Sequence, residues 1–279
     1  MTPGPEFVAA GAALLLALLA GPAVGPWIAG PGGRLRVDDG GRGNLPVLFV
    51  HGNGGNRTQW KAQLEHLRAS RRAVAFDLRG MGESEPAGDA DYSVAGFSRD
   101  VAAVADALGL DRFVLVGHSY GGAVVADYAG GHPDRVAALV FADVAGDIRD
   151  TPDKALAALR DGLLPEHYED FTRRWFQGIL AGGTDATKSV VLRSLAATRS
   201  EVFIAATMGL YAFDPVSALA PYRGPRLHIA SFLADNPAAI HHTFKDMPVQ
   251  IIRGASHWLM LDCPDDFNRI LDATLASLQ

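Results

Sequence analysis

Short apolar runs alternate with helical patterns along most of the chain from Arg34 onward. Six continuous runs rich in Val, Ile, Leu and Phe predict strands. These runs span residues 46–50, 73–76, 113–116, 136–141, 226–229 and 249–252. Continuous rather than alternating apolar residues are typical of strands that helices cover on both faces. The pattern therefore predicts an α/β fold with a mostly parallel, doubly wound sheet.

The clearest helix between these strands spans residues 93–108. Val94, Phe97, Val101 and Val104 recur there at helical spacing. Ser93 precedes them as a capping residue, and a glycine follows at position 109, where helices commonly end. This helix leads directly into the predicted strand over residues 113–116.

A long segment interrupts the alternation, because 75 residues, 147–221, separate two of the predicted strands. An ordinary crossover is much shorter. Residues 168–180 and 188–208 look helical and carry many aromatic and large apolar side chains. We interpret residues 147–221 as a helical lid over a core formed by residues 34–146 and 222–279. The expected apolar pocket includes Trp175, Phe176 and Trp258.

The N-terminal segment is apolar and uncharged over residues 7–20, and a Gly-Pro pair follows it. Its length suits the hydrophobic region of a signal peptide, with cleavage after Ala23, although Glu6 and no basic residue precede the run. Residues 1–23 are thus predicted to be a signal peptide or a retained anchor. An upstream start of the chain or a helix lying on the protein surface is the alternative. Residues 24–33 would form a tether, and an exported or membrane-anchored protein is favoured over a cytoplasmic one.

Composition and charge narrow the possible functions. The net charge of −6 is modest and no basic stripe is present, which argues against nucleic-acid binding and leaves residues 7–20 as the expected membrane contact. A single cysteine, Cys263, excludes an intramolecular disulfide and a thiolate metal cluster. His241 and His242 are adjacent, but no Asp, Glu or Cys at ligand spacing completes a metal site. With no nucleotide motif either, the sequence predicts a protein without cofactor or metal.

Candidate chemistry begins at residues 117–121, which read Gly-His-Ser-Tyr-Gly between a predicted strand and a predicted helix. A serine on so tight a turn needs small neighbours, because strand and helix approach closely at positions 117 and 121. The helix that follows directs its N–H groups toward the same point, where an oxyanion can be stabilised. Ser119 is therefore the predicted nucleophile.

Three further motifs follow predicted strands in the same way. They are residues 51–55 (HGNGG), 77–84 (DLRGMGES) and 254–257 (GASH). With the serine motif, they make the chain resemble the α/β-hydrolase superfamily, in the lid-bearing branch of esterases, dehalogenase-like enzymes and C–C hydrolases. Met81 stands where relatives usually have His, which we expect to alter packing rather than chemistry.

The resemblance implies roles for residues in the serine motif and in the motifs over residues 51–55 and 254–257. His257 matches the catalytic histidine, which would take the proton of Ser119. The backbone amides of Asn53 and Tyr120 are the expected oxyanion donors, and His51 would buttress the loop. The side chain of Asn53 has two open interpretations, a polar contact to the substrate or a turn residue.

Two aspartates satisfy the requirement for an acid that follows a strand edge and reaches His257. Asp235 is preferred because it follows the strand over residues 226–229 and gives the family order of nucleophile, acid and histidine. The family's usual Gly-x-x-Asp turn is absent there, so Asp143, at the end of the strand over residues 136–141, is the alternative.

The implied function is hydrolysis of a small, ester-like substrate through an acyl-enzyme on Ser119. Two alternatives stay open. The same triad serves C–C bond hydrolysis or cofactor-free perhydrolysis, and a non-catalytic module would use the pocket to hold a hydrophobic ligand. The natural substrate and the oligomeric state do not follow from the sequence.

Overall fold

The computed structural model describes residues 26–278, so the predicted signal peptide or anchor lies outside the described residues. Within this range an eight-stranded sheet runs in the order β1-β2-β4-β3-β5-β6-β7-β8. β1 and β2 are antiparallel to their neighbours and the other pairings are parallel. The strands are β1 (Trp27–Ala29), β2 (Arg34–Gly40), β3 (Val47–Val50), β4 (Ala73–Phe76), β5 (Phe113–His118), β6 (Val136–Ala142), β7 (Arg226–Ala230) and β8 (Val249–Ile251).

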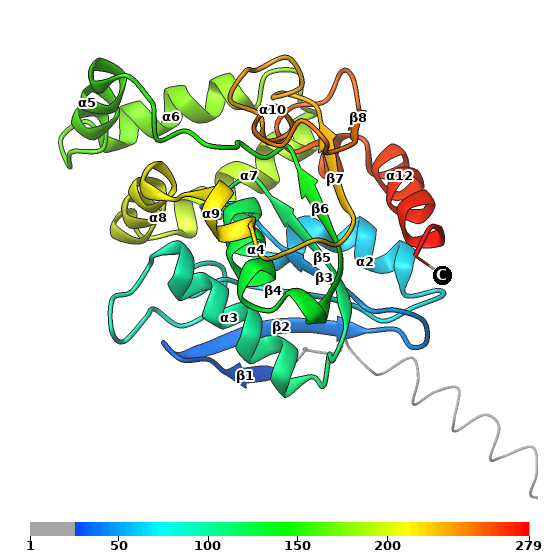
Figure 1. The fold of residues 1–279 in the computed structure, drawn as a ribbon. Coiled ribbons are helices and arrows are strands. Elements are labelled where there is room, and N and C mark those ends of the chain that lie inside the picture. The colour runs from blue at the N-terminus through cyan, green and yellow to red at the C-terminus, as the bar shows by residue number, and fades with distance from the viewer. Residues whose placement is uncertain (1–25, 279) are drawn as a thin grey trace, which may run out of the picture.

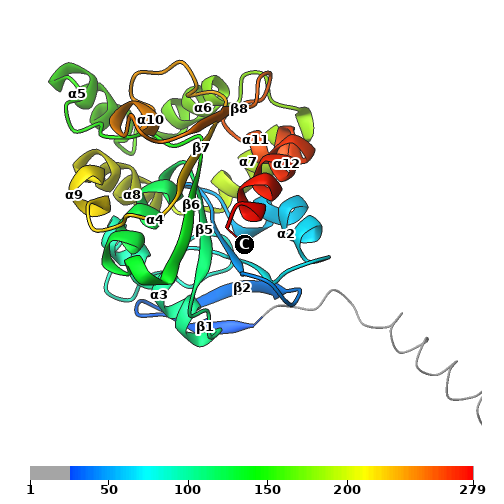
Figure 2. The same cartoon turned by 45° about the vertical axis from the view of Figure 1, so that its right-hand side comes forward.

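Helices cover both faces of this sheet, as Figures 1 and 2 show, which confirms the predicted doubly wound architecture. α3 (Val94–Ala107) and α4 (Tyr120–Gly131) pack on one face. α2 (Lys61–Leu67) and α12 (Pro264–Ala276) pack on the other. Successive residues of one strand enter opposite cores, since Leu48 and Val50 of β3 belong to one apolar cluster and Val47 and Phe49 to the other. The remaining helical elements are η1 (Arg57–Trp60), η2 (Pro133–Arg135), α5 (Asp153–Gly162), α6 (Tyr168–Ile179), α7 (Asp185–Ala197), α8 (Ser200–Ala212), α9 (Pro215–Leu219), α10 (Ile240–Thr243) and α11 (Leu259–Asp262).

The predicted caps of α3 are confirmed. The hydroxyl of Ser93 accepts a hydrogen bond from the backbone N–H of Gly96 at 3.0 Å. Gly109 follows the helix with φ +62, a left-handed conformation that glycine adopts without a steric penalty. Local sequence signals therefore defined both ends of this helix correctly.

The structure differs from the predictions at the two edges of the sheet. Trp27–Ala29, which fall in the predicted tether, form strand β1 and pair with β2. The side chain of Ile28 is buried, and the guanidinium groups of Arg34 and Arg36 stack on the Trp27 ring. At the opposite edge, β8 is exposed along its length rather than buried. It is the last strand of the sheet, so β7 covers one side of it and the other side is open.

The segment between β6 and β7 contains α5 to α9. α5 and α6 lie above the end of the sheet toward which the strand arrows point (Figure 1), whereas α9 packs against α4. The single helical pattern predicted over residues 188–208 is two helices, α7 and α8, which meet at Thr198 and Arg199. Within residues 26–278, no helix has the length and apolar character needed to cross a membrane.

Candidate active site

The turn between β5 and α4 presents Ser119 in a strained backbone conformation, with φ 51° and ψ −121°. The predicted need for small neighbours is confirmed. A Cβ atom at position 117 would lie 2.5 Å from the carbonyl oxygen of Gly121, and one at position 121 would lie 2.6 Å from that of Val50. Larger side chains at either position would force the strand and helix apart and displace the serine.

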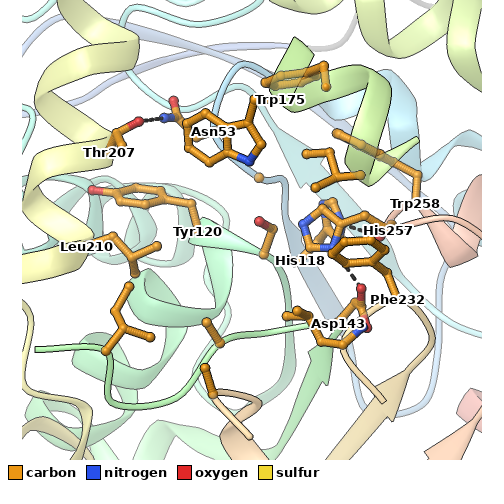
Figure 3. A pocket seen from close by; sticks show the side chains of 18 of the residues that line it. Asn53, His118, Tyr120, Asp143, Trp175, Thr207, Leu210, Phe232, His257 and Trp258 are labelled. Atoms are coloured by element: carbon orange, nitrogen blue, oxygen red, sulfur yellow. Dashed lines mark hydrogen bonds and ion pairs between the residues drawn. The ribbon is translucent and has the colours of Figure 1, made fainter. Parts of the chain in front are cut away.

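The loop that follows β6 carries Asp143, whose side chain is fully buried and whose φ is 48°. Its Oδ2 accepts a hydrogen bond from Nδ1 of His257 at 2.7 Å, drawn as a dashed line in Figure 3. Its Oδ1 accepts from the backbone N–H groups of Ser231 at 2.8 Å and Leu233 at 3.0 Å. Burial opposes ionisation of this carboxyl, but the hydrogen bonds outweigh burial and hold the pKa of Asp143 below its ordinary value.

The preferred acid of the sequence analysis, Asp235, does not occupy this position. Its side chain is exposed, and it makes no hydrogen bond to His257 within residues 26–278. The loop after β7 instead contributes backbone donors, because the N–H groups of Ser231 and Leu233 both point at Asp143. Tight turns then bury Ala234 and leave the next residue facing outward. The alternative acid, Asp143, is thus the one that the structure brings to His257.

His257 lies between β8 and α11, as expected from the sequence, and its side chain is 9% exposed. Its backbone is held from two sides. The N–H of His257 donates to the carbonyl of Ile179, and Nε2 of His118 donates to the carbonyl of His257 at 2.9 Å. His257 and Ser119 line the same cavity, although no hydrogen bond joins Ser119 Oγ to Nε2 of His257 in this structure. Contacts between a serine and a neighbouring imidazole often lengthen when such a cavity is empty and shorten when a ligand fills it.

His118, the variable position of the serine motif, is a buried structural residue. Burial lowers its pKa to about 3, so its ring is neutral at physiological pH. The Nε2–H tautomer follows from its hydrogen bond to the His257 carbonyl. The two imidazole rings lie 4.8 Å apart between centroids. No local feature of the sequence indicates this support, because the partner of His118 lies 139 residues away in the chain.

The loop over residues 51–55 surrounds the space above Ser119. His51 is buried, with Nδ1 donating to the carbonyl of Gly52 at 2.8 Å and Nε2 accepting from the N–H of Leu78 at 3.0 Å. The predicted buttressing by His51 is thereby confirmed. The backbone amides of Asn53 and Tyr120 have no acceptor within residues 26–278, and both residues line the cavity. Tyr120 is the first residue of α4, so its N–H has no partner within the helix.

The side chain of Asn53 contacts helix α8, which neither of the two open interpretations predicted. Its Nδ2 donates to the carbonyl of Phe203 and to Oγ1 of Thr207, both on α8 and both at 2.9 Å. Figure 3 shows the contact with Thr207. No local signal indicated this partner, which lies about 150 residues away in the chain.

The cavity that contains Ser119, His257 and Asp143 has a volume of about 320 Å³. The three residues predicted for a pocket, Trp175, Phe176 and Trp258, all line it. Most of the other wall is apolar as well, with contributions from Ile148, Phe203, Leu210, Tyr211 and Phe232. Among residues 26–278, no cluster of three His, Cys, Asp or Glu side chains is suited to hold a metal ion.

Comparison with known proteins supports the fold. The family model described as alpha/beta hydrolase fold matches residues 46–261. A 2-hydroxymuconate semialdehyde hydrolase of Pseudomonas sp. (strain CF600) is 36% identical over 128 residues, which are 45% of this chain and 45% of that protein. The dihydrolipoyllysine-residue acetyltransferase component of an acetoin cleaving system of Pseudomonas putida is 42% identical over 146 residues, or 50% of this chain and 37% of that protein. The matched segments therefore span less than half the length of these relatives.

A solved structure extends the similarity over most of the chain. It is described as Est816, an N-acyl homoserine lactone degrading enzyme, and superposes with a TM-score of 0.75 at 25% sequence identity. The match covers 89% of this chain and 99% of that one. The two chains therefore share the arrangement of sheet and helices beyond the segment that the sequence comparisons align.

Proposed function

The chain belongs to the alpha/beta hydrolase fold family, and we propose that it is a serine hydrolase that cleaves uncharged carboxylic esters through an acyl-enzyme on Ser119. One observation carries the proposal. A buried carboxylate, Asp143, holds Nδ1 of His257 in the cavity into which the strained Ser119 turn opens. This arrangement is the acid and base that a serine needs in order to act as a nucleophile.

In the proposed reaction, the carboxylate of Asp143 fixes the tautomer of His257 in which Nδ1 carries the proton. Nε2 then takes the proton of Ser119 as Oγ attacks the ester carbonyl carbon. The resulting oxyanion accepts hydrogen bonds from the amides of Asn53 and Tyr120, and removal of one such donor costs about 3 kcal/mol of transition-state stabilisation. His257 returns the proton to the departing alcohol. Water, activated by the same base, releases the acid and restores Ser119.

The polarity of the cavity favours esters over carboxylate-bearing substrates. None of its lining residues within the described range is Lys or Arg, and Asp143 is already engaged with His257. A substrate carboxylate would lose its hydration there without gaining a cationic partner, which costs several kcal/mol. C–C bond hydrolysis is the second candidate, because the chain is 36% identical to a 2-hydroxymuconate semialdehyde hydrolase over the matched segment. A muconate is an anion, so this cavity suits it poorly.

The segment over residues 147–221 is proposed to act as a lid. Trp175 and Phe176 of α6 and Leu210 and Tyr211 of α8 line the cavity. These side chains exclude water from the acyl-enzyme and supply the apolar surface that binds the substrate.

Labelling with a fluorophosphonate probe tests the proposal without a guess at the substrate, because the probe reacts with activated serines. We expect the wild type to be labelled and Ser119→Ala and His257→Ala to be unlabelled. An unlabelled wild type would argue for a non-catalytic ligand-binding module. Parallel assays with neutral short-chain aryl esters and with a carboxylate-bearing vinylogous diketone then separate the two hydrolytic candidates. Turnover of the diketone alone would reject the ester assignment.

A further inference from the structure

We propose that the side chain of Asn53 is a positioning residue, which holds the oxyanion-binding amide of the same residue in place by tying it to helix α8 at Thr207. The inference rests on the proposed function, since it assumes that the Asn53 amide binds the oxyanion. It assigns to residues 203–207 of α8 a role in the geometry of a site whose other parts come from the edge of the sheet.

The contact uses the full donor capacity of the Asn53 amide group. One N–H of Nδ2 donates to the carbonyl of Phe203 and the other to Oγ1 of Thr207, each at 2.9 Å. The Thr207 hydroxyl in turn donates to the Phe203 carbonyl at 2.8 Å. Because both donors have acceptors in fixed positions on one helical turn, the orientation of Asn53 is determined.

This contact is poorly explained by stability alone. Oδ1 of Asn53 is buried and has no hydrogen-bond partner in the described part of the chain. A buried acceptor without a partner carries an uncompensated desolvation cost, which offsets much of what the two donated bonds contribute. An apolar side chain would avoid this cost but would leave the loop without a directional link to α8. A polar group kept at such a cost calls for a functional explanation.

The loop around Asn53 is held between the sheet edge and the lid segment. On the sheet side, a Cβ atom at position 52 would lie 3.0 Å from Nδ1 of His118 and 3.1 Å from Cβ of Ser119. On the other side, one at position 54 would lie 3.2 Å from Cδ1 of Leu195 on α7. Residue 53 lies between these two contacts, so its amide position responds to both.

The partners of Asn53 also face the substrate space. Phe203 and Thr207 line the cavity together with Leu210 of the same helix. A change in the position of α8 therefore moves both the apolar wall and the group that holds the oxyanion donor. Small displacements of a catalytic group by about 1 Å reduce rates substantially, so the link affects the chemical step more than substrate binding.

The test measures the rate constant for phosphonylation of Ser119 by the fluorophosphonate probe, together with kcat and KM for a neutral aryl ester. We expect Asn53→Ala and Thr207→Val each to reduce the phosphonylation rate constant and kcat about tenfold while changing KM less than twofold, part of the effect of losing an oxyanion donor outright. Thr207→Ser keeps the hydroxyl and should recover most of the phosphonylation rate constant that Thr207→Val loses. The double variant Asn53→Ala/Thr207→Val should be no slower than the slower single variant, because both remove one link.

Asn56→Ala is the matched control. Nδ2 of Asn56 donates to Oγ of Ser194 on α7, so this variant removes a second amide link from the same loop to the lid segment. It also removes the cap of η1, where Oδ1 of Asn56 accepts from the N–H and the hydroxyl of Thr58, and is therefore a demanding control. It should leave the phosphonylation rate constant unchanged. Thermal unfolding checks that each variant is folded, and the near-isosteric Thr207→Val keeps the test valid if Asn53→Ala is unstable.

The outcomes separate this inference from the proposed function. A labelled wild type with Asn53→Ala and Thr207→Val both labelled at the wild-type rate would overturn the positioning role and leave the serine hydrolase intact. A wild type that is not labelled at all would overturn both. Equal slowing in Asn56→Ala and Asn53→Ala would also reject the specific role, since any loosening of the loop would then suffice.

Discussion

The loops that follow β6 and β7 lie side by side at the carboxyl ends of two adjacent parallel strands, and each contains an aspartate. They nevertheless contribute different chemical groups to the site. The loop after β6 contributes a buried side chain, Asp143, in a left-handed backbone conformation. The loop after β7 contributes backbone N–H groups and leaves Asp235 in solvent. The position of an acid relative to a strand end therefore does not identify the carboxylate that a histidine meets. What identifies it is which loop can bury a carboxylate and still satisfy both of its oxygens.

Strand β7 also supports the loop after β6 through a side-chain hydrogen bond. Nε2 of His228, a fully buried residue of β7, accepts a hydrogen bond from the N–H of Val144 at 3.1 Å. Nδ1 of His228 lies 2.8 Å from Nδ1 of His241, so the tautomer of His228 is determined by its two neighbours. His241, one of the two adjacent histidines considered for metal binding, therefore contacts His228 of β7.

The largest expected effect comes from removing the negative charge of the aspartate in the loop after β6 or in the loop after β7. Asp143→Asn should lower kcat for a neutral aryl ester about 10⁴-fold, because the neutral amide no longer stabilises the imidazolium and favours the wrong tautomer of His257. Asp235→Asn should change kcat less than twofold. Steady-state kinetics on both variants checks the assignment. A large loss in Asp235→Asn with little change in Asp143→Asn would restore the original preference.

The second effect concerns pH and the support that β7 gives. Burial lowers the pKa of His228 to about 4, from an ordinary value of 6.5 in the unfolded chain. Well above pH 6.5 the His228 ring is neutral in both the folded and the unfolded state, so its titration does not change the free energy of unfolding. As pH falls from 6.5 to 4, the unfolded chain binds a proton that the folded protein does not, so the free energy of unfolding decreases by about 3 kcal/mol from this residue.

Urea denaturation of the wild type and of His228→Gln across this pH range measures that contribution. Gln is chosen because its side-chain carbonyl can accept the Val144 N–H without titrating. The stability of the wild type relative to the variant should decline as pH falls from 6.5 to 4. Parallel stability curves would show that His228 does not titrate in this way.

A third, somewhat smaller effect isolates the hydrogen bond itself. His228→Leu should reduce the free energy of unfolding at pH 7.5 by about 1–3 kcal/mol more than His228→Gln does, because the buried N–H of Val144 loses its acceptor. Denaturant midpoints at that pH provide the measurement. Equal losses in the two variants would indicate that His228 acts through packing alone.

The smallest effect concerns the apolar side chain that the loop after β7 adds to the cavity. Phe232 is 43% exposed and presents its ring to that of His257 at 6.0 Å between centroids. Phe232→Ala should raise KM a few-fold, about 1 kcal/mol, and leave kcat unchanged, because a half-exposed ring loses part of the usual burial energy. Val249→Ala, on the exposed edge strand, should change neither constant. A fall in kcat for Phe232→Ala would instead indicate that the ring orients His257.

Several features of the fold follow from local sequence signals. The runs of apolar residues placed β3 to β7 within one or two residues of their observed limits, and the cap and terminating glycine of α3 were readable directly. The glycines at positions 117 and 121 identify the turn of Ser119 by sterics alone. Periodicity was less informative at the edges of the sheet. β1 and β2 were not predicted, nor was the exposure of β8, because these features depend on which neighbours a strand has.

The sequence by itself determined the elements whose causes lie within a few residues, namely strands, caps and the tight turn that presents the candidate nucleophile. The tertiary structure decided which of two similar aspartates meets His257, because that depends on how two loops more than 80 residues apart pack against each other. It also decided the partner of Asn53, on a helix about 150 residues away. Hydrogen bonds between distant segments depend on how the sheet and the helices over it pack, so no local pattern encodes them.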